Sequence, residues 1–275
     1  MFFGLVLALS GTFYLVGFLA GDLPWIGARL PASALMFVCP AVAAVMLVRR
    51  RGGRRGLRAW LSAAFRPPRR RQVVWYLVAA LLPPLIMVLS YLVMRGAGMP
   101  LPESPVIRWS HAPLLAVIFL VSALAEELGW SGYATGPLRR RWGTLAAGLV
   151  IGVVWAAWHV VPHLQTGHDL AWIAGHGTFT VLFRVILVSL YAETGASVVA
   201  PTICHASFNV AWSLFPNAGS HYHPTVTAAV TAAAAAVVLA LPPRRRRRRA
   251  YGHRDVGATA DAAGTTPHTL GPLPG

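Results

Sequence analysis

The chain has 275 residues, of which 56% are hydrophobic and only 12% are charged. A soluble domain carries about a quarter charged residues, so this composition excludes an ordinary soluble globule. Apolar runs of about twenty residues also exclude disorder for most of the chain. The sequence therefore predicts an all-α membrane protein, a polytopic bundle of helices.

The formal net charge is +16, and the basic side chains that produce it are arginines. A strongly basic chain often binds nucleic acid. Here the arginines flank apolar segments and no soluble basic module is present, so we expect no nucleic-acid binding. Cys39 and Cys204 both lie within apolar segments and are expected to be small buried residues.

About eight apolar segments have the length and composition expected of transmembrane helices. The third of them contains Pro83-Pro84, which is expected to kink it. In chain order the predicted segments are about Phe2–Ala20, Ala32–Val48, Gln72–Met94, Ala112–Tyr133, Gly143–His163, Leu170–Ala192, Ala196–Phe215 and Val226–Leu241.

Three arginine-rich stretches fall on the same side of the membrane if the segments number eight: Arg49–Arg71, Arg139–Arg141 and Arg244–Arg249. The positive-inside rule makes that side cytoplasmic, together with both termini. The arginines either hold anionic lipid headgroups or only anchor the topology. We divide the chain into a transmembrane helical domain, residues 1–242, and a basic cytoplasmic tail, residues 243–275, whose composition predicts disorder.

Ionisable side chains inside the bilayer are the first candidates for a functional site, because each costs on the order of 3 kcal/mol to insert. Two adjacent glutamates point about 100° apart around a helix, so two different tasks are expected for them. A histidine and an asparagine four residues apart share one helix face. The candidate set is Glu126, Glu127, His159, His205 and Asn209.

A carboxylate and two imidazoles in a dry cavity support two kinds of hydrolytic chemistry. They can deprotonate a water, or they can bind a divalent metal such as zinc that lowers the pKa of the water. Asn209 could stabilise an oxyanion or complete the metal shell. From these residues alone, a hydrolase and a proton-coupled transporter both remain open. His163 and His176 are expected to be packing residues, and His168 a solvated loop residue.

Three stretches in this part of the chain carry recognisable motifs: AEELGWSGYATGPL at Ala125–Leu138, WAAWH at Trp155–His159, and LYAETGASVVAPTICHASFNVAW at Leu190–Trp212. In this order, on successive apolar segments, they resemble the motifs of the CAAX protease and bacteriocin-processing family, the CPBP or Abi intramembrane proteases. The resemblance covers about residues 112–215.

The resemblance implies an eight-helix intramembrane endopeptidase whose catalytic set includes Glu127. It implies that Glu126 is the general base that activates water and that His159 helps to bind that water or a metal. His205 and Asn209 would stabilise the oxyanion or complete the metal site. The tentative metal ligands are therefore Glu126, His159, His205 and Asn209, although the spacing is not the HExxH of zincins.

The implied substrate is a peptide or a membrane-anchored protein segment, entering laterally or from the cytoplasm. The family includes enzymes that trim prenylated C-terminal tripeptides and bacterial members linked to bacteriocin processing or self-immunity. The arginine-only basic set and the high alanine content suggest a GC-rich bacterial genome, so we expect a bacterial plasma membrane protein with a substrate that is not prenylated.

One residue departs from the family pattern, since Ser131 stands where the first motif has an arginine. That arginine would lie four residues after Glu127 and could pair with it. Without it, three outcomes are open: Glu127 stays protonated, Arg184 replaces the arginine across the bundle, or one of Arg139–Arg141 reaches back.

The departure also leaves two other classes of protein open. A catalytically decayed family member would act as a membrane binding or scaffold protein. A proton-coupled transporter is less favoured, because such proteins often contain internal repeats and none is visible here.

Overall fold

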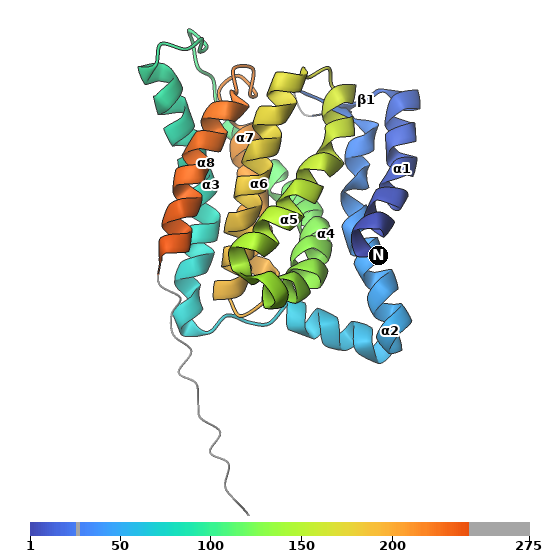
Figure 1. The fold of residues 1–275 in the computed structure, drawn as a ribbon. Helices are drawn as coiled ribbons and strands as arrows, with labels where there is room; N and C mark the ends of the chain where they lie inside the picture. Colours follow the sequence, from blue (N-terminus) through green and yellow to red (C-terminus); the bar gives the residue numbers. More distant parts are fainter. Residues whose placement is uncertain (26–27, 242–275) are drawn as a thin grey trace, which may run out of the picture. The chain divides into compact units, whose positions relative to one another are not determined.

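The structure is a computed structural model that describes residues 1–25 and 28–241 of the chain. The predicted basic tail, residues 243–275, lies outside the described residues. Within them, eight α-helices form a bundle (Figure 1). The helices are α1 (Phe2–Ala20), α2 (Cys39–Ala64), α3 (Val73–Gly96), α4 (Ala112–Gly129), α5 (Gly136–Gln165), α6 (Leu170–Glu193), α7 (Val199–Ser213) and α8 (Pro224–Ala240).

The prediction of an all-α membrane bundle is confirmed. Five segments of the described residues are long and apolar enough to cross a membrane: Phe2–Ala20, Ala32–Ala64, Arg70–Gly96, Trp109–Gln165 and Leu170–Glu193. The fourth contains both α4 and α5, and α8 is apolar but shorter. The protein is an integral membrane protein, whereas the number of eight crossings stays a prediction.

Short elements complete the described chain between the long helices. Two four-residue strands, β1 (Asp22–Trp25) and β2 (Ala28–Pro31), pair antiparallel between the first two predicted segments. Two 3₁₀ turns precede α3 and α4, and the 3₁₀ helix η1 (Ala32–Val38) leads into α2. A π-helical turn, η4 (Trp130–Thr135), joins α4 to α5.

Two arginine-rich stretches that lie outside the predicted segments are largely helical. Helix α2 continues to Ala64, well past the predicted end at Val48, and changes direction at Gly53, which has φ 59°. Helix α5 begins at Gly136 and breaks at Gly143, which has φ 81°. Glycine adopts these positive φ angles at little cost, so residues 54–64 of α2 and residues 136–142 of α5 form separate helical pieces, each carrying part of an arginine-rich stretch. Helix α3 continues across Pro83-Pro84 as one helix.

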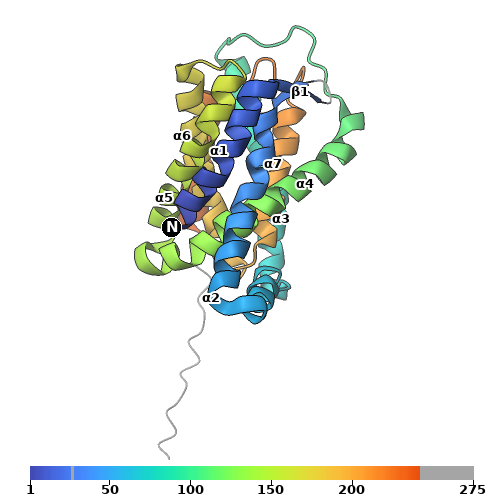
Figure 2. The same ribbon diagram turned by 90° about the vertical axis from the view of Figure 1, so that its right-hand side faces the viewer.

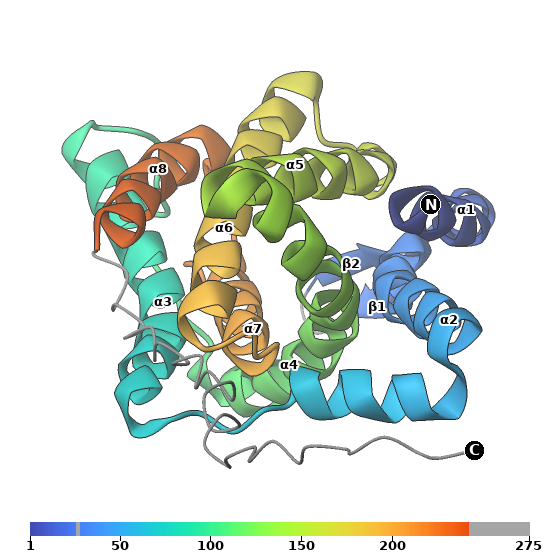
Figure 3. The same ribbon diagram turned by 60° about the horizontal axis from the view of Figure 1, so that its bottom comes forward.

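The close packing of α5 on α6 positions the site described below. The two helices lie side by side (Figure 3), and α5 carries the small-residue pattern of Gly148 and Gly152 at this contact. A Cβ atom on Gly148 would lie 2.8 Å from the Val185 Cα, and one on Gly152 would lie 2.8 Å from the Val181 Cα. Glycines spaced in this way let two membrane helices approach closely. On the other side of the site, α4 contacts α2 and α7 and runs obliquely to α2 (Figure 2).

Substitution of Gly152 by alanine is predicted to destabilise the protein, because the new methyl group would meet the backbone of α6. Overpacking of this kind costs about 1–3 kcal/mol, so the apparent melting temperature of the detergent-purified protein should fall. The matched control is Gly177→Ala on α6, whose Cβ would lie at an ordinary 3.8 Å from the Ala156 Cβ. Equal melting temperatures for both variants would contradict the close approach at Gly152.

Candidate active site

The Glu127 carboxylate lies at the centre of a buried polar network formed by α4, α6 and α7. Arg184 of α6 donates from Nη1 to both Glu127 oxygens at 2.8 Å, and neither side chain is exposed. The Nδ1 atom of His205 on α7 lies 3.1 Å from Glu127 Oε1. A carboxylate paired with a guanidinium is ionised and only accepts hydrogen bonds, so His205 Nδ1 carries the hydrogen of this contact.

The π-helical turn η4, which follows α4, adds a fourth group to this network. The Ser131 hydroxyl, one helical turn after the glutamate, donates to Glu127 Oε2. Ser131 belongs to the π-helical turn η4, where Thr135 also donates to the Trp130 carbonyl at 2.9 Å. Single π-helical turns inside helices occur frequently at functional sites.

Trp155 of α5 connects the buried network to the second glutamate. Its indole Nε1 donates to Glu126 Oε2 at 2.9 Å. The Arg184 guanidinium carbon lies 3.8 Å from the centre of the Trp155 ring, a cation–π contact. The remaining nitrogens of Arg184, Nε and Nη2, have no hydrogen-bond partner among the described residues. Trp155 therefore contacts both the Glu127–Arg184 ion pair and the Glu126 carboxylate.

His159 is oriented by the helix that carries it. Its Nδ1 atom lies 2.9 Å from the backbone carbonyl of Trp155, one turn earlier. A carbonyl oxygen can only accept, so Nδ1 carries the hydrogen and Nε2 presents a lone pair. The His159 ring also packs edge-on against Trp158, with centroids 4.8 Å apart.

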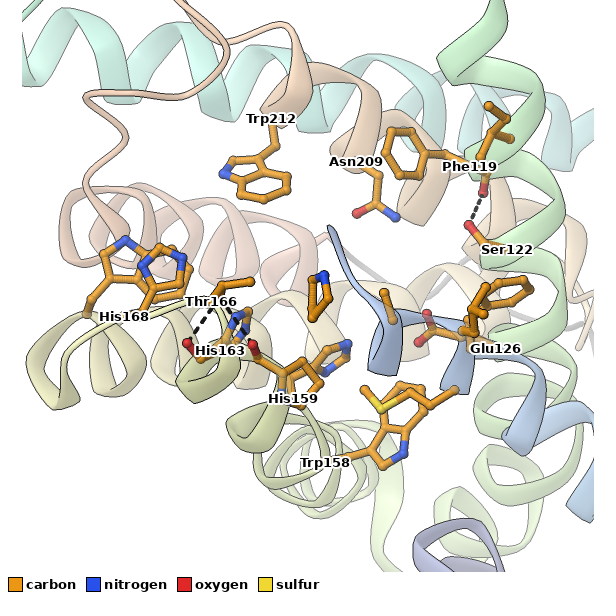
Figure 4. Close-up of a pocket in the computed structure, with 18 residues that line it drawn as sticks. Phe119, Ser122, Glu126, Trp158, His159, His163, Thr166, His168, Asn209 and Trp212 are labelled. Carbon is orange, nitrogen blue, oxygen red and sulfur yellow. Dashed lines mark hydrogen bonds between the residues drawn. The ribbon is translucent and has the colours of Figure 1, made fainter. Parts of the chain in front are cut away.

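A cavity of about 590 Å³ brings three of the five predicted residues together. Figure 4 shows Glu126 from α4, His159 from α5 and Asn209 from α7 pointing toward the same space. Glu127 and His205 do not line this cavity. The two adjacent glutamates therefore have different surroundings, as their angular separation on the helix predicts.

The far part of the cavity is lined by rings from α5, α6, α7 and the α5–α6 connection. His168 stacks on Trp172 with ring centroids 3.6 Å apart, and both line the cavity with His163 and Trp212. The expectation that His168 is simply solvated is wrong. Burial lowers the pKa of His168 below its ordinary value, and the neighbouring Asp169 carboxylate only partly opposes this. A lowered pKa keeps this ring uncharged at neutral pH.

Comparison with known proteins bears on the middle of the chain. Residues 108–211 match the family model described as Type II CAAX prenyl endopeptidase Rce1-like. We name residues 108–211 the CPBP segment, after the family whose motifs they resemble. The CAAX prenyl protease 2 of Methanococcus maripaludis is 40% identical over 42 residues, an alignment that covers 15% of this chain and 16% of that protein.

The CPBP segment contains all the residues of the cavity's polar end and of the buried network. At position 131 this segment has serine where the family motif has an arginine that could pair with Glu127. The structure shows that Arg184 supplies the cation for Glu127 from another helix, α6. Ser131, in place of an arginine at that position, contributes a hydroxyl to the same carboxylate.

The residues of the CPBP segment do not form a ready-made metal site. Among the described residues, no group of three or more His, Cys, Asp and Glu side chains has an arrangement that could hold a metal ion. The predicted metal ligands lie in two different places. Glu126 and His159 line the cavity, whereas His205 does not line it and is hydrogen-bonded to Glu127.

Two contributors to the site were not identified from the sequence. Trp155 was noted only as the first residue of the WAAWH motif, yet it donates to Glu126 and covers Arg184. The four-residue spacing of Gly148 and Gly152 was a visible signal for close packing against α6. That packing brings Arg184 next to α5, since a Cβ on Gly152 would lie 3.2 Å from the Arg184 Cβ.

Substitution of Arg184 by leucine is predicted to destabilise the protein strongly. It leaves the Glu127 carboxylate buried without its cation, and breaking a buried pair in this way costs about 3–5 kcal/mol. The double variant Arg184→Leu/Ser131→Arg returns a cation four residues from Glu127 on the same helix, so its melting temperature should lie above that of Arg184→Leu. A melting temperature for Arg184→Leu equal to that of wild type would contradict the structural importance of this pair.

Proposed function

We propose that the protein is an intramembrane endopeptidase of the CPBP type that hydrolyses a peptide bond with a water activated by Glu126. The observation that carries this proposal is the convergence of Glu126, His159 and Asn209 on one cavity within the CPBP segment. We further infer that the protein resides in a bacterial plasma membrane with both termini in the cytoplasm, following the placement of its arginines.

The water is held by two acceptors from different helices. Glu126 Oε2 is occupied by the Trp155 indole, which leaves Oε1 to take a proton from the water as general base. His159 Nε2 accepts the second hydrogen of the same water, because Nδ1 is already bonded to the Trp155 carbonyl. With both hydrogens held, an oxygen lone pair of the water is free to attack the peptide carbonyl carbon.

The attack forms a C–O bond and moves negative charge onto the peptide oxygen. We assign the Asn209 side-chain amide to donate a hydrogen bond to this oxyanion, a task worth about 3 kcal/mol for one such donor in a protease. Glu126, now protonated, then delivers its proton to the peptide nitrogen as the C–N bond breaks. The products are a carboxylic acid and an amine, and Glu126 returns to its ionised form.

Glu127 and His205 act in this proposal as positioning residues. Both lie behind the cavity wall, where Glu127 fixes His205 and Arg184. The His205 and Trp155 rings meet edge-on at 5.1 Å, and Arg184 covers the Trp155 ring. The network therefore holds the indole that orients Glu126, in keeping with the general need of catalytic groups for support by surrounding hydrogen bonds and packing.

The substrate we propose is a peptide or a membrane-anchored protein segment. The relative with the matching segment carries the name of a CAAX prenyl protease. The arginine-only basic set of this chain suggests a GC-rich bacterial genome, and we therefore favour a substrate that is not prenylated. We also propose that the arginine-rich stretches beside the membrane contact anionic lipid headgroups.

The rival classes receive less support. The main argument for a decayed scaffold was the missing arginine at position 131, and Arg184 pairs with Glu127 in its place. A proton-coupled transporter would use the same intramembrane carboxylates, but the CPBP match of residues 108–211 favours a protease.

Substitution of Glu126 by glutamine is predicted to lower peptide cleavage by roughly 10²–10⁴-fold, since loss of a general base typically costs this much. The assay offers the detergent-purified protein a mixed panel of prenylated and unprenylated peptides and measures products by mass spectrometry. Glu103→Gln is the matched control, because Glu103 is exposed in a loop outside the cavity. Cleavage by the Glu126→Gln variant at the wild-type rate would contradict the proposed base.

The same assay with a chelator tests the predicted metal. A zinc ion held by Glu126, His159, His205 and Asn209 would make cleavage sensitive to the chelator and restorable by added zinc. Unchanged cleavage in chelator, with Glu126 still required, would contradict the metal and support the water mechanism above. Peptide binding without cleavage by a folded wild-type protein would favour the scaffold instead.

A further inference from the structure

Helix α5 contains a proline one turn after Trp158, in the part of the helix that carries His159. Pro162 has no backbone N–H, so the Trp158 carbonyl lacks the hydrogen bond that a regular helix would give it. A carbonyl left unpaired in the apolar interior of a membrane protein is costly. Another group is therefore needed at the carbonyl of the residue that directly precedes His159.

Helix α1 supplies that group. The Tyr14 hydroxyl donates to the Trp158 carbonyl at 2.7 Å. One turn earlier on the same face of α1, the Ser10 hydroxyl oxygen accepts from Trp158 Nε1 at 2.6 Å. Ser10 and Trp158 are both fully buried. One face of α1 therefore holds both the backbone and the side chain of Trp158.

The contact between α1 and α5 continues to the end of α5. Gln165 Nε2 donates to the backbone carbonyl of Tyr14 at 2.9 Å. A Cβ atom on Gly17 would lie 2.5 Å from Gln165 Oε1, so the glycine lets this side chain of α5 approach α1 closely. Tyr14 is thus tied to α5 through its backbone as well as through its hydroxyl.

Trp158 in turn packs on the histidine that we propose to hold the water. The two rings meet edge-on with centroids 4.8 Å apart, and both residues line the cavity. The Trp155 ring contacts the same imidazole at 5.5 Å. The His159 ring therefore rests on the tryptophan that α1 holds, and a shift of Trp158 would move His159 Nε2 away from the water.

We propose that Tyr14 and Ser10 of α1 are positioning residues for peptide hydrolysis. By holding Trp158 at the break in α5, they place the His159 ring to accept a hydrogen from the attacking water. The inference rests on the proposed function and adds a helix to it, because α1 lies outside the CPBP segment of residues 108–211.

The first test is Tyr14→Phe, which removes only the hydroxyl, in the peptide-cleavage assay with the detergent-purified full chain. We expect kcat to fall about 10–10²-fold, since misplacing a catalytic group by about 1 Å can cost about 10²-fold. The KM should stay unchanged, because Tyr14 does not line the cavity. All rates are measured below the melting temperature of every variant.

Tyr76→Phe is the matched control for this substitution. The buried Tyr76 hydroxyl on α3 has no hydrogen-bond partner among the described residues, so its removal should leave kcat at the wild-type value. A wild-type kcat for Tyr14→Phe would overturn the inference.

A substitution at the break in α5 should remove the need for Tyr14. Pro162→Ala restores an N–H four residues after Trp158, so Tyr14→Phe should cost little further activity when it is added to Pro162→Ala. This reference also absorbs any direct effect of Pro162, which lines the cavity. Ser10→Ala should lower kcat in both backgrounds, because the new N–H does not replace the bond to the indole. An equal loss from Tyr14→Phe in both backgrounds would overturn the inference.

A second cycle separates positioning of the imidazole from a general loss of folded enzyme. In His159→Ala no ring is left to position, so adding Tyr14→Phe should leave the residual rate unchanged. A fall by the same factor as in the wild-type background would show a purely structural role and would overturn the inference.

Failure of this inference is distinct from failure of the proposed function. A wild-type kcat in Tyr14→Phe, beside a lost rate in Glu126→Gln, overturns the positioning role alone. Cleavage by Glu126→Gln at the wild-type rate contradicts the proposed function itself. A folded wild type that cleaves no peptide also contradicts that function, and this inference then fails with it.

Discussion

The buried carboxylate of Glu127 is the constraint on which the rest of the site depends. A charged group in the interior of a membrane protein is costly unless it is paired and hydrogen-bonded. Here Arg184, His205 and Ser131 satisfy it from three helical elements. The ion pair thereby fixes α4, α6 and α7 relative to one another, and these helices with α5 carry the polar residues of the cavity.

The pair also explains how two adjacent glutamates serve different purposes. Glu127 points into the bundle and is neutralised there, so Glu126 on the next position of α4 is free to face the cavity. The link between them is Trp155, whose ring covers Arg184 and whose indole nitrogen bonds to Glu126. The positions of the proposed catalytic carboxylate and of the structural ion pair are therefore coupled through one tryptophan on α5.

The sequence predicted the helical bundle because apolar length is a strong signal, and it predicted the site residues because ionisable groups are rare in such segments. The predicted segments left out the helical pieces that carry arginines at the end of α2 and the start of α5. The breaks at Gly53 and Gly143 that set these pieces apart depend on backbone angles that composition does not reveal. The pairing of Arg184 with Glu127 remained one of three alternatives, because choosing among them requires knowing which helices are neighbours. The metal and the catalytic roles stay predictions.

A double-mutant cycle on Glu127→Gln and Arg184→Met, read by unfolding of the detergent-purified protein, tests this coupling most directly. Each single variant leaves one buried charge unpaired, whereas the double variant removes both charges. The double variant should therefore be destabilised by less than the sum of the two single variants, with a coupling of about 1–3 kcal/mol. Additive effects of the two substitutions would contradict a site organised around the buried pair.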